Sequence, residues 1–198
     1  MSERMTEFGT LERRAAVAAL LQDRGDLLVI TGLGSPTYDV FAAGDHDANF
    51  YLWGAMGGAG LMGLGLALAQ PERPVAVITG DGEQLMGLGG LLTIAVKRPP
   101  NLTLVVLDNG HFGETGMQRS HSGHGQDLAA IAASAGLATM TVHTTQELAA
   151  ARAALHGKDG PRLIRVRIAP GETPRALPAR DGVFLKTRFR GALGYAVA

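Results

Sequence analysis

Residues 75–109 read VAVITGDGEQLMGLGGLLTIAVKRPPNLTLVVLDN, and this stretch determines the predicted fold. Val75–Thr79 is almost wholly apolar and ends at a Gly-Asp-Gly sequence, and Leu102–Leu107 is a second apolar run. Continuous apolar runs of this length, bounded by turn residues, are typical of strands that are buried on both faces. Residues 85–96 have the pattern of a helix that ends before a Pro-Pro pair. The stretch therefore predicts a strand–helix–strand unit with two parallel strands.

The alternation of strands and helices continues on both sides of this unit. Further strands are predicted at residues 27–31, 51–53, 139–142 and 163–168, and helices at 11–24, 35–41, 57–69, 128–135 and 145–155. This order predicts a single α/β domain over residues 1–198, with a doubly wound, mostly parallel sheet and helices on both faces. Residues 170–198 form a C-terminal tail with a final helix expected from about Gly182.

Composition and charge exclude several classes of protein. The 198 residues are 46% hydrophobic, which is enough for one sizeable core. The formal net charge is zero, so we expect neither nucleic acid nor an anionic membrane surface as a partner. The absence of cysteine excludes disulfides, thiolate metal sites and iron–sulfur clusters. Together with a charged N-terminus that lacks an apolar signal-peptide core, this absence favours a cytoplasmic protein.

Residues 49–70 carry no charge and are long enough to span a bilayer. However, six glycines fall between Gly54 and Gly65, and the turn-like sequence Gly-Ala-Met-Gly-Gly breaks the helical pattern. Glycine in a helix interior costs about 1 kcal/mol relative to alanine. We therefore expect no membrane span here, but a buried helix that packs closely against other backbone or a ligand.

Two neighbouring strand ends carry complementary polar groups. Asp81 follows the first apolar strand, and Asn109 follows the second. Carboxylate and amide oxygens are hard ligands that suit Mg²⁺, which usually takes only one or two side chains and fills its other positions with phosphate and water. Gly80 and Gly82 allow backbone N–H groups to approach an anion at the start of the next helix. The pattern predicts a site for a metal-bridged diphosphate at the carboxyl edge of the sheet.

The order and spacing of these motifs resemble those of the thiamine diphosphate-dependent enzymes. NFYLWGAMGGAGLMGLGLALA, residues 49–69, resembles the Gly-Ser-Met-Gly segment of that family and the helix after it. GDGEQLMGLGGLLTIA and NLTLVVLDNGHFGETGMQ are especially similar to the sulfopyruvate and phosphonopyruvate decarboxylases. The resemblance covers residues 27–168 and implies the thiamine diphosphate-binding fold, in the form of the diphosphate-binding domain or subunit. It also implies thiamine diphosphate and Mg²⁺ as cofactors.

The resemblance implies individual roles for the matching residues. The metal ligands would be the Asp81 carboxylate, the Asn109 side chain and the main-chain carbonyl of His111. The carbonyl of Gly54 would accept a hydrogen bond from the 4′-amino group of the cofactor, and Met56 would be the apolar wedge that bends the cofactor. These two are the catalytic candidates, because the bend brings the 4′-nitrogen close to the C2 proton. The complete set of expected cofactor-binding residues is Gly54, Ala55, Met56, Gly80, Asp81, Gly82, Glu83, Asn109, His111, Phe112 and Gly113.

Some residues depart from the family pattern or allow a second interpretation. Asp108-Asn109 stands where the family often has Asn-Asn, and Ala55 lacks the hydroxyl of the usual serine. Met56 has the alternative of a simple core residue. The loop histidines His111, His121 and His124, together with Arg119 in GMQRSH, are candidates for substrate contacts, with solvent exposure as the alternative for each.

The resemblance implies a carboxy-lyase that decarboxylates a small 2-oxo acid, with the cofactor as the electron sink. In this family a glutamate on a pyrimidine-binding domain activates the cofactor. No acid of this sequence is placed to serve as that glutamate, and Glu83 lies at the other end of the cofactor. We therefore expect an alpha-type, pyrimidine-binding partner subunit that supplies the glutamate, in a hetero-oligomer such as alpha2beta2 or larger.

Two other functions remain open at the level of sequence. A carboligase subunit of the acetolactate synthase type would share the same cofactor-binding residues. A non-catalytic, nucleotide-binding or regulatory α/β module would lack a matched Asp81–Asn109 pair, and GLGSPT after residues 27–31 lacks the last glycine of a dinucleotide fingerprint. The absence of cysteine argues against the 2-oxo acid:ferredoxin oxidoreductases, which use iron–sulfur clusters.

Overall fold

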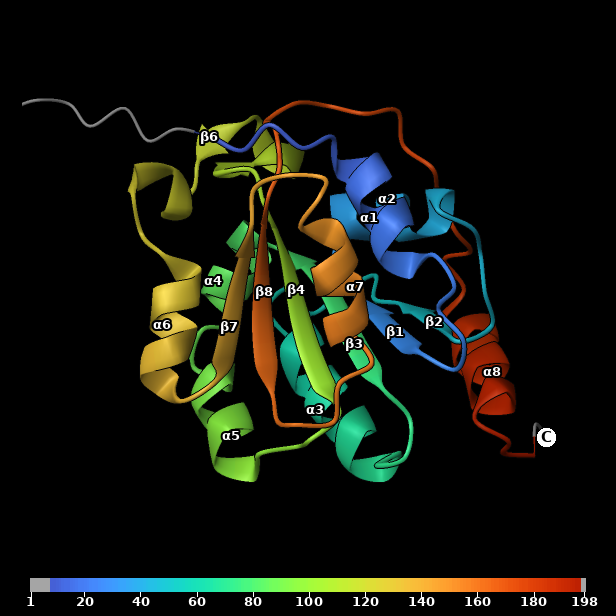
Figure 1. The fold of residues 1–198 in the computed structure, drawn as a ribbon. Helices are drawn as coiled ribbons and strands as arrows, with labels where there is room; N and C mark the ends of the chain where they lie inside the picture. Colours follow the sequence, from blue (N-terminus) through green and yellow to red (C-terminus); the bar gives the residue numbers. More distant parts are fainter. Residues whose placement is uncertain (1–7, 197–198) are drawn as a thin grey trace, which may run out of the picture.

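The computed structural model describes residues 8–196, and its centre is a six-stranded sheet in which every strand pair is parallel (Figure 1). The strand order is β2-β1-β3-β4-β8-β7. The strands are β1 (Leu28–Thr31), β2 (Asn49–Tyr51), β3 (Val75–Gly80), β4 (Leu102–Asp108), β7 (Ala138–Val142) and β8 (Arg162–Arg167). The first half of the charged N-terminal segment that favours a cytoplasmic protein lies outside the described residues, as do the last two residues of the predicted C-terminal tail.

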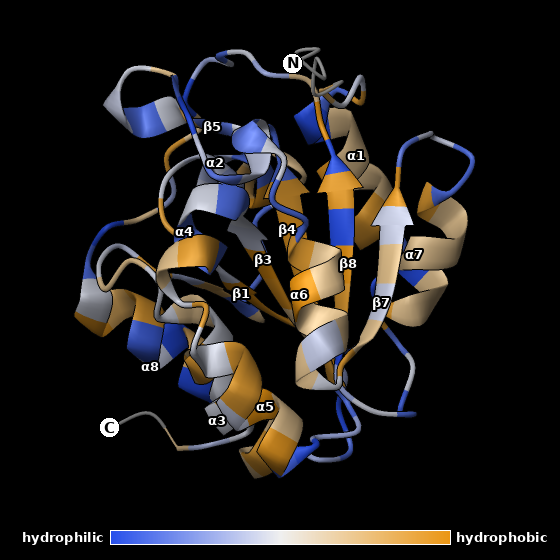
Figure 2. Cartoon of the chain, turned by 90° about the vertical axis from the view of Figure 1, so that its left-hand side faces the viewer, coloured by the Kyte–Doolittle hydropathy of each residue, from blue (hydrophilic) through white to orange (hydrophobic). Residues whose placement is uncertain are grey.

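Helices cover both faces of the sheet, which confirms the predicted doubly wound α/β class (Figures 1 and 2). One face carries α1 (Arg13–Leu21), α2 (Ser35–Ala42) and α7 (Leu148–Ala154), and the other carries α3 (Ala59–Ala69), α4 (Asp81–Met86), α5 (Gly90–Lys97) and α6 (Leu128–Ala135). The last helix, α8 (Gly182–Ala192), lies beside β2 at the sheet edge. It contributes Leu185 to one core and Phe189 to the other.

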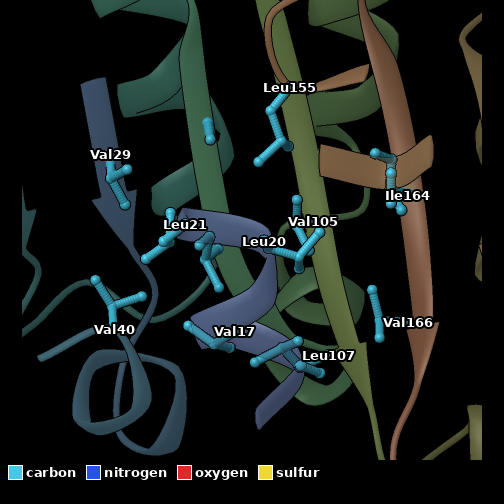
Figure 3. Packing of buried hydrophobic residues seen from close by; sticks show 14 of the residues in the cluster. Val17, Leu20, Leu21, Val29, Val40, Val105, Leu107, Leu155, Ile164 and Val166 are labelled. Carbon is cyan, nitrogen blue, oxygen red and sulfur yellow. The ribbon is translucent and has the colours of Figure 1, made fainter. Parts of the chain in front are cut away.

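The apolar runs at residues 75–79 and 102–107 form the two central strands, β3 and β4. β3 and β4 are buried at every position except Gly80, and they pair from Val75 with Leu102 to Gly80 with Leu107. On one face, Val17 and Leu20 of α1 pack toward Leu107 and Val105 of β4 (Figure 3). The parallel pairing of β3 and β4 aligns their carboxyl ends at one edge of the sheet.

The crossovers run on opposite faces in a way that marks a ligand-binding position. The chain passes from β1 to β2 through α2 on one face, and from β3 to β4 through α4 and α5 on the other. It therefore leaves the adjacent strands β1 and β3 in opposite directions. In open α/β sheets, ligands bind outside the carboxyl ends of the strands at such a topological switch point.

The predicted single helix over residues 85–96 is wrong, because the chain forms α4 and α5 with a break between them. Gly87, at the break, packs against the backbone of Gly57, and a Cβ atom at Gly87 would overlap with the Gly57 carbonyl oxygen. The Gly-Asp-Gly sequence is also not a free turn, since Asp81 is already the first residue of α4. The long polar segment after β4 is partly ordered into β5 (His111–Phe112), β6 (Gln118–Arg119) and two 3₁₀ turns.

The first residues of α7 and α3 also differ from the predicted ones. α7 begins at Leu148 rather than Thr145, and the Glu147 carboxylate accepts hydrogen bonds from the backbone N–H groups of His143 (2.6 Å) and Thr144 (2.9 Å). The glycine-rich helix α3 begins at Ala59 rather than Gly57 and has 11 residues.

Among residues 8–196, none of the helices combines the length and the hydropathy that crossing a bilayer requires.

Candidate functional site

A cavity of about 210 Å³ opens at the topological switch point. Its walls come from the segments that follow β1, β3 and β4, with Ile168 and residues of α1 and α2 on one side. Of the predicted cofactor-binding residues, all except Gly54 and Ala55 line this cavity: Met56, Gly80, Asp81, Gly82, Glu83, Asn109, His111, Phe112 and Gly113. The structure thus brings together residues 80–83 and residues 109–113, which α5 and β4 separate in the sequence.

Asp81 is one of three buried acids that line this cavity, with Asp39 and Glu83, and 2% of its surface is exposed. Its Oδ2 atom accepts hydrogen bonds from the hydroxyl groups of Ser120 and Ser122, the latter at 2.8 Å. Burial and the nearby carboxylate of Asp108 raise the pKa of Asp81, and the serine hydroxyls oppose this shift.

Asp108, the neighbouring acid, has its charge compensated within the chain. Its Oδ2 atom accepts hydrogen bonds from Arg165 Nε at 2.6 Å and from Arg167 Nη1 at 3.0 Å, both on β8. Its Oδ1 atom accepts from the backbone N–H of Gly110 at 3.0 Å. In contrast, no basic side chain within residues 8–196 forms an ion pair with Asp81. A buried carboxylate without a counter-charge is unfavourable, so Asp81 provides a strong reason for a cation to bind here.

Asn109 supplies the second oxygen at the site and is 9% exposed. Its Oδ1 atom accepts a hydrogen bond from the backbone N–H of His111 at 2.9 Å, which leaves one lone pair of the amide oxygen for a further partner. The ring nitrogen Nδ1 of His111 lies 2.8 Å from the main-chain oxygen of Asn109. These two contacts order the turn after β4 and hold both residues at the cavity wall.

The start of α4 offers backbone donors to the same cavity. No side chain caps this helix, so the N–H groups of its first turn lack the usual capping acceptor. Gly82 packs against the ring of Phe112, and a Cβ atom at Gly82 would lie 2.6 Å from that ring. A glycine is therefore required for the chain to run between the ring and the cavity.

The side chain of Glu83 has a different task from its backbone. Its Oε2 atom accepts hydrogen bonds from the N–H of Leu33 at 2.6 Å and from Thr79 Oγ1 at 3.1 Å. Its Oε1 atom accepts from the N–H of Gly57 at 3.3 Å. The carboxylate therefore connects the turn after β1 with the segment before α3, and only the backbone N–H is available for an anion.

Of the Gly54–Met56 segment, Met56 lines the cavity, and Gly54 and Ala55 do not. Gly54 and Ala55 are exposed, and Ala55 adopts a positive φ of 54°. Met56 lines the cavity but is 42% exposed, so it is not a core methionine. Its position leaves the side chain free to contact a ligand that extends outward from the cavity, and the wedge role stays a prediction.

The loop candidates are distributed unevenly around the site. His111 lines the cavity, whereas His121, His124 and Arg119 are absent from its wall. The Arg119 guanidinium is exposed and lies 5.5 Å from the centroid of the Phe8 ring.

The ionic groups in and behind the cavity wall were not predicted from the sequence. Arg13 and Asp39 form a buried ion pair (Nε to Oδ2, 2.8 Å) that lines the cavity, and burial raises the pKa of Asp39 despite the two arginines beside it. The contact between Ser122 and Asp81 was not predicted either. For the two arginines that pair with Asp108, the sequence does contain a signal, because Arg165 and Arg167 are two residues apart and so lie on one face of their strand.

The donor set at the cavity suits a hard divalent cation. It combines one carboxylate, one amide oxygen and backbone donors, which is the chemistry of a magnesium-bridged phosphate group. Within the described residues there is no cluster of three or more His, Cys, Asp or Glu side chains that would suggest a zinc-type site.

Comparison with known proteins agrees with this geometry. Residues 37–166 match the family model described as "Thiamine pyrophosphate enzyme, C-terminal TPP binding domain". Phosphonopyruvate decarboxylase of Streptomyces viridochromogenes is 40% identical over 174 residues, which cover 84% of this chain and 43% of that protein. Sulfopyruvate decarboxylase subunit beta of Methanothermobacter thermautotrophicus is 40% identical over 161 residues, covering 81% of this chain and 84% of that subunit.

A solved structure shows the same arrangement of the chain. The structure of a Mycobacterium smegmatis protein described as a thiamin diphosphate-dependent enzyme matches with a TM-score of 0.71 and 26% identity, covering 83% of this chain and 33% of that one. The chain therefore spans less than half the length of the Streptomyces relative and of the Mycobacterium protein. With the family model matching most of its residues, this chain belongs to the thiamine pyrophosphate enzymes, as their C-terminal, cofactor-binding domain.

Proposed function

We propose that this chain binds the diphosphate of thiamine diphosphate through Mg²⁺ and forms the diphosphate-binding half of a 2-oxo acid decarboxylase of the sulfopyruvate and phosphonopyruvate type. One observation carries the proposal: Asp81 is buried at the cavity, lacks a basic partner within residues 8–196, and lies in the same wall as Asn109. The identity to relatives named as these decarboxylases supports the choice of reaction.

Each group of the site has a defined task in this proposal. The Asp81 carboxylate, the Asn109 amide oxygen and the main-chain carbonyl of His111 hold Mg²⁺, and the N–H groups of Gly82 and Glu83 bind the diphosphate. When bound, the cofactor supplies an electron sink for the loss of CO₂. The chain's own residues orient and neutralise the diphosphate, and Met56 offers an apolar surface in the cavity wall.

The activating glutamate comes, in this proposal, from a pyrimidine-binding domain in a hetero-oligomer. The relative of 84% coverage is named as a beta subunit, which supports an assembly of unlike subunits. The Glu83 carboxylate is engaged by Leu33, Thr79 and Gly57, so it is not available for this role. A cytoplasmic location and an alpha2beta2 stoichiometry stay predictions.

The decisive experiment compares wild type with Asp81→Asn, each with the pyrimidine-binding domain present. For wild type at about 100 times the dissociation constant, Mg²⁺ and thiamine diphosphate should stabilise the fold by about 2.7 kcal/mol, seen as a higher melting temperature. Asp81→Asn should lose this ligand-dependent shift because the metal loses its charged oxygen. The exposed Asp26→Asn is the matched control and should behave as wild type. A wild-type protein whose melting temperature is the same with and without Mg²⁺ and thiamine diphosphate would contradict the proposal.

The carboligase alternative is tested by the products. A decarboxylase releases CO₂ from sulfopyruvate or phosphonopyruvate and yields the corresponding aldehyde, whereas a carboligase joins the decarboxylated fragment to a second carbonyl compound. Product analysis with and without an added 2-oxo acid acceptor separates the two. The nucleotide-binding module is the less favoured alternative, because Asp81 and Asn109 line one cavity in a member of the thiamine pyrophosphate family.

A further inference from the structure

Two buried serines lie directly behind the proposed metal ligand. Ser120 is 0% exposed and directly follows β6, and Ser122 is 2% exposed and begins the 3₁₀ turn Ser122–His124. The backbone N–H of Ser120 donates to the carbonyl of Gly110 at 2.9 Å, and this bond ties the serine turn to the turn after β4. Buried serines are uncommon, and each needs hydrogen-bond partners.

Both hydroxyl groups contact the same oxygen of the same carboxylate. Ser120 Oγ and Ser122 Oγ contact Oδ2 of Asp81, and neither contacts Oδ1. The two hydroxyl groups are 2.9 Å apart, so they also contact each other. Contacts from two hydroxyl groups to one oxygen restrict the rotation of the carboxylate about its χ angles and direct its other oxygen away from the serines.

Ser122 also connects the metal site to a second acid. Its Oγ lies 2.7 Å from Oδ1 of Asp108, whose Oδ2 is held by Arg165 and Arg167. These arginines are anchored on β8, next to β4 in the sheet. A series of side-chain contacts therefore links β8 to Asp81 through Asp108 and Ser122.

We infer that Ser120 and Ser122 are positioning residues for the divalent cation, which hold the Asp81 carboxylate so that Oδ1 faces the metal. This inference rests on the proposed function, because it assigns Asp81 as a metal ligand. Groups that orient a metal ligand in this way typically change metal affinity by roughly 10–100-fold when they are removed. The serines carry no charge, so they orient the acid without compensating it, and the requirement for the cation remains.

The test measures the affinity for Mn²⁺ in the presence of thiamine diphosphate and the pyrimidine-binding domain. Free Mn²⁺ is followed by its electron paramagnetic resonance signal for wild type, Ser120→Ala and Ser122→Ala. We expect each alanine variant to bind Mn²⁺ roughly 10–100-fold more weakly. Ser122→Thr keeps the hydroxyl group and should recover most of the affinity. Ser134→Ala, an exposed serine on α6, is the matched control and should leave the affinity unchanged.

Thermal unfolding without metal separates positioning from simple folding effects. If an alanine variant fails to fold, Ser120→Cys or Ser122→Cys replaces it, because a thiol has similar size but donates only weakly. Wild type that binds Mn²⁺ no better than the folded alanine or cysteine variants overturns this inference alone. Affinity that is lost in Ser122→Ala and not recovered in a folded Ser122→Thr also overturns it. Wild type that binds no Mn²⁺ overturns the proposed function, and the inference with it.

Discussion

Oγ of Ser122 lies 2.8 Å from Oδ2 of Asp81 and 2.7 Å from Oδ1 of Asp108, so a single hydroxyl group separates two buried carboxylates. A hydroxyl has one proton and can donate fully to only one of them at a time. Arginines face only one of the pair, Asp108. The repulsion between the two carboxylates therefore mainly destabilises the ionised form of Asp81, which has no such counter-charge within residues 8–196.

The affinity for Mg²⁺ should increase with pH. Burial and the Asp108 carboxylate raise the pKa of Asp81 above its ordinary value of 3.8, and Mg²⁺ requires the ionised form. Protons therefore compete with the metal below the raised pKa, by up to about tenfold per pH unit, and the affinity reaches a plateau above it. Calorimetric titration of Mg²⁺ with thiamine diphosphate at several pH values measures this.

The stability of the metal-free protein should change in the opposite direction. The native state binds more protons than the unfolded state between pH 3.8 and the raised pKa, so this acid lowers the stability as pH rises through that window. Asp81→Asn removes the titrating group and should flatten its contribution in both experiments. An Mg²⁺ affinity that is constant from acidic to neutral pH would argue against the assignment of Asp81.

Replacing Asp108 should harm the fold more than the metal site. Asp108→Asn leaves the buried Arg165 and Arg167 without their shared anion, and the expected loss in the free energy of unfolding is about 3 kcal/mol. Denaturant unfolding measures this loss. Asn109 is retained and the repulsion on Asp81 is reduced, so Mg²⁺ affinity at acidic pH should not fall.

The control for this substitution is an ion pair between a single arginine and an exposed aspartate. Asp159→Asn breaks a contact with Arg162 in which the Asp159 side chain is 77% exposed, and it should cost less than about 1 kcal/mol. Equal losses for Asp159→Asn and Asp108→Asn would show that burial of the Asp108 pair has no energetic weight.

Adding one methyl group at Gly82 should disturb the diphosphate-binding turn. The new Cβ would lie 2.6 Å from the Phe112 ring, so the ring or the turn must shift, at a cost of about 1–3 kcal/mol. We expect Gly82→Ala to bind thiamine diphosphate more weakly, as measured by calorimetry. Gly89→Ala is the matched control, because no atom lies within 4 Å of its added Cβ. Wild-type affinity in Gly82→Ala would show that the turn has room to spare.

Replacing each of two glycines of α3 by alanine should change the free energy of unfolding in opposite directions. A Cβ at Gly63 would overlap with the Val77 side chain of β3, so Gly63→Ala should destabilise the fold by about 1–3 kcal/mol. No atom lies within 4 Å of a Cβ at Gly65, so Gly65→Ala should stabilise the helix by up to about 1 kcal/mol. Denaturant unfolding of the isolated chain distinguishes them, and the same sign for both would refute this account of the helix packing.

Local patterns were sufficient to predict the sheet and the proximity of Asp81 and Asn109 at one of its edges. β3 and β4 are apolar at nearly every position because both faces are covered, and their carboxyl ends are fixed by parallel pairing. Asp81 and Asn109 therefore had to meet at one edge. The break between α4 and α5 was not predictable in the same way, because it depends on Gly87 approaching Gly57 from 30 positions away along the chain.

The polar contacts behind the site depend on tertiary structure. The alternation in residues 163–168 normally places arginines toward solvent, yet Arg165 and Arg167 are buried, where both form ion pairs with Asp108. Ser122 belongs to a loop without periodicity, so no sequence pattern indicated that its hydroxyl faces Asp81. The direction of the Glu83 side chain was not predicted either, because it depends on contacts with Leu33, Thr79 and Gly57.

The residues that surround Asp81 come from segments between β1 and β8, and they meet only when the central strands have paired. The unfolded chain therefore has no preformed site, and the cofactor and its metal bind the native state almost exclusively. Under the proposed function, vitamin supply controls the lifetime of this protein as well as its turnover. In a cell that is starved of thiamine, a larger fraction of molecules would be unfolded at any moment and exposed to proteases.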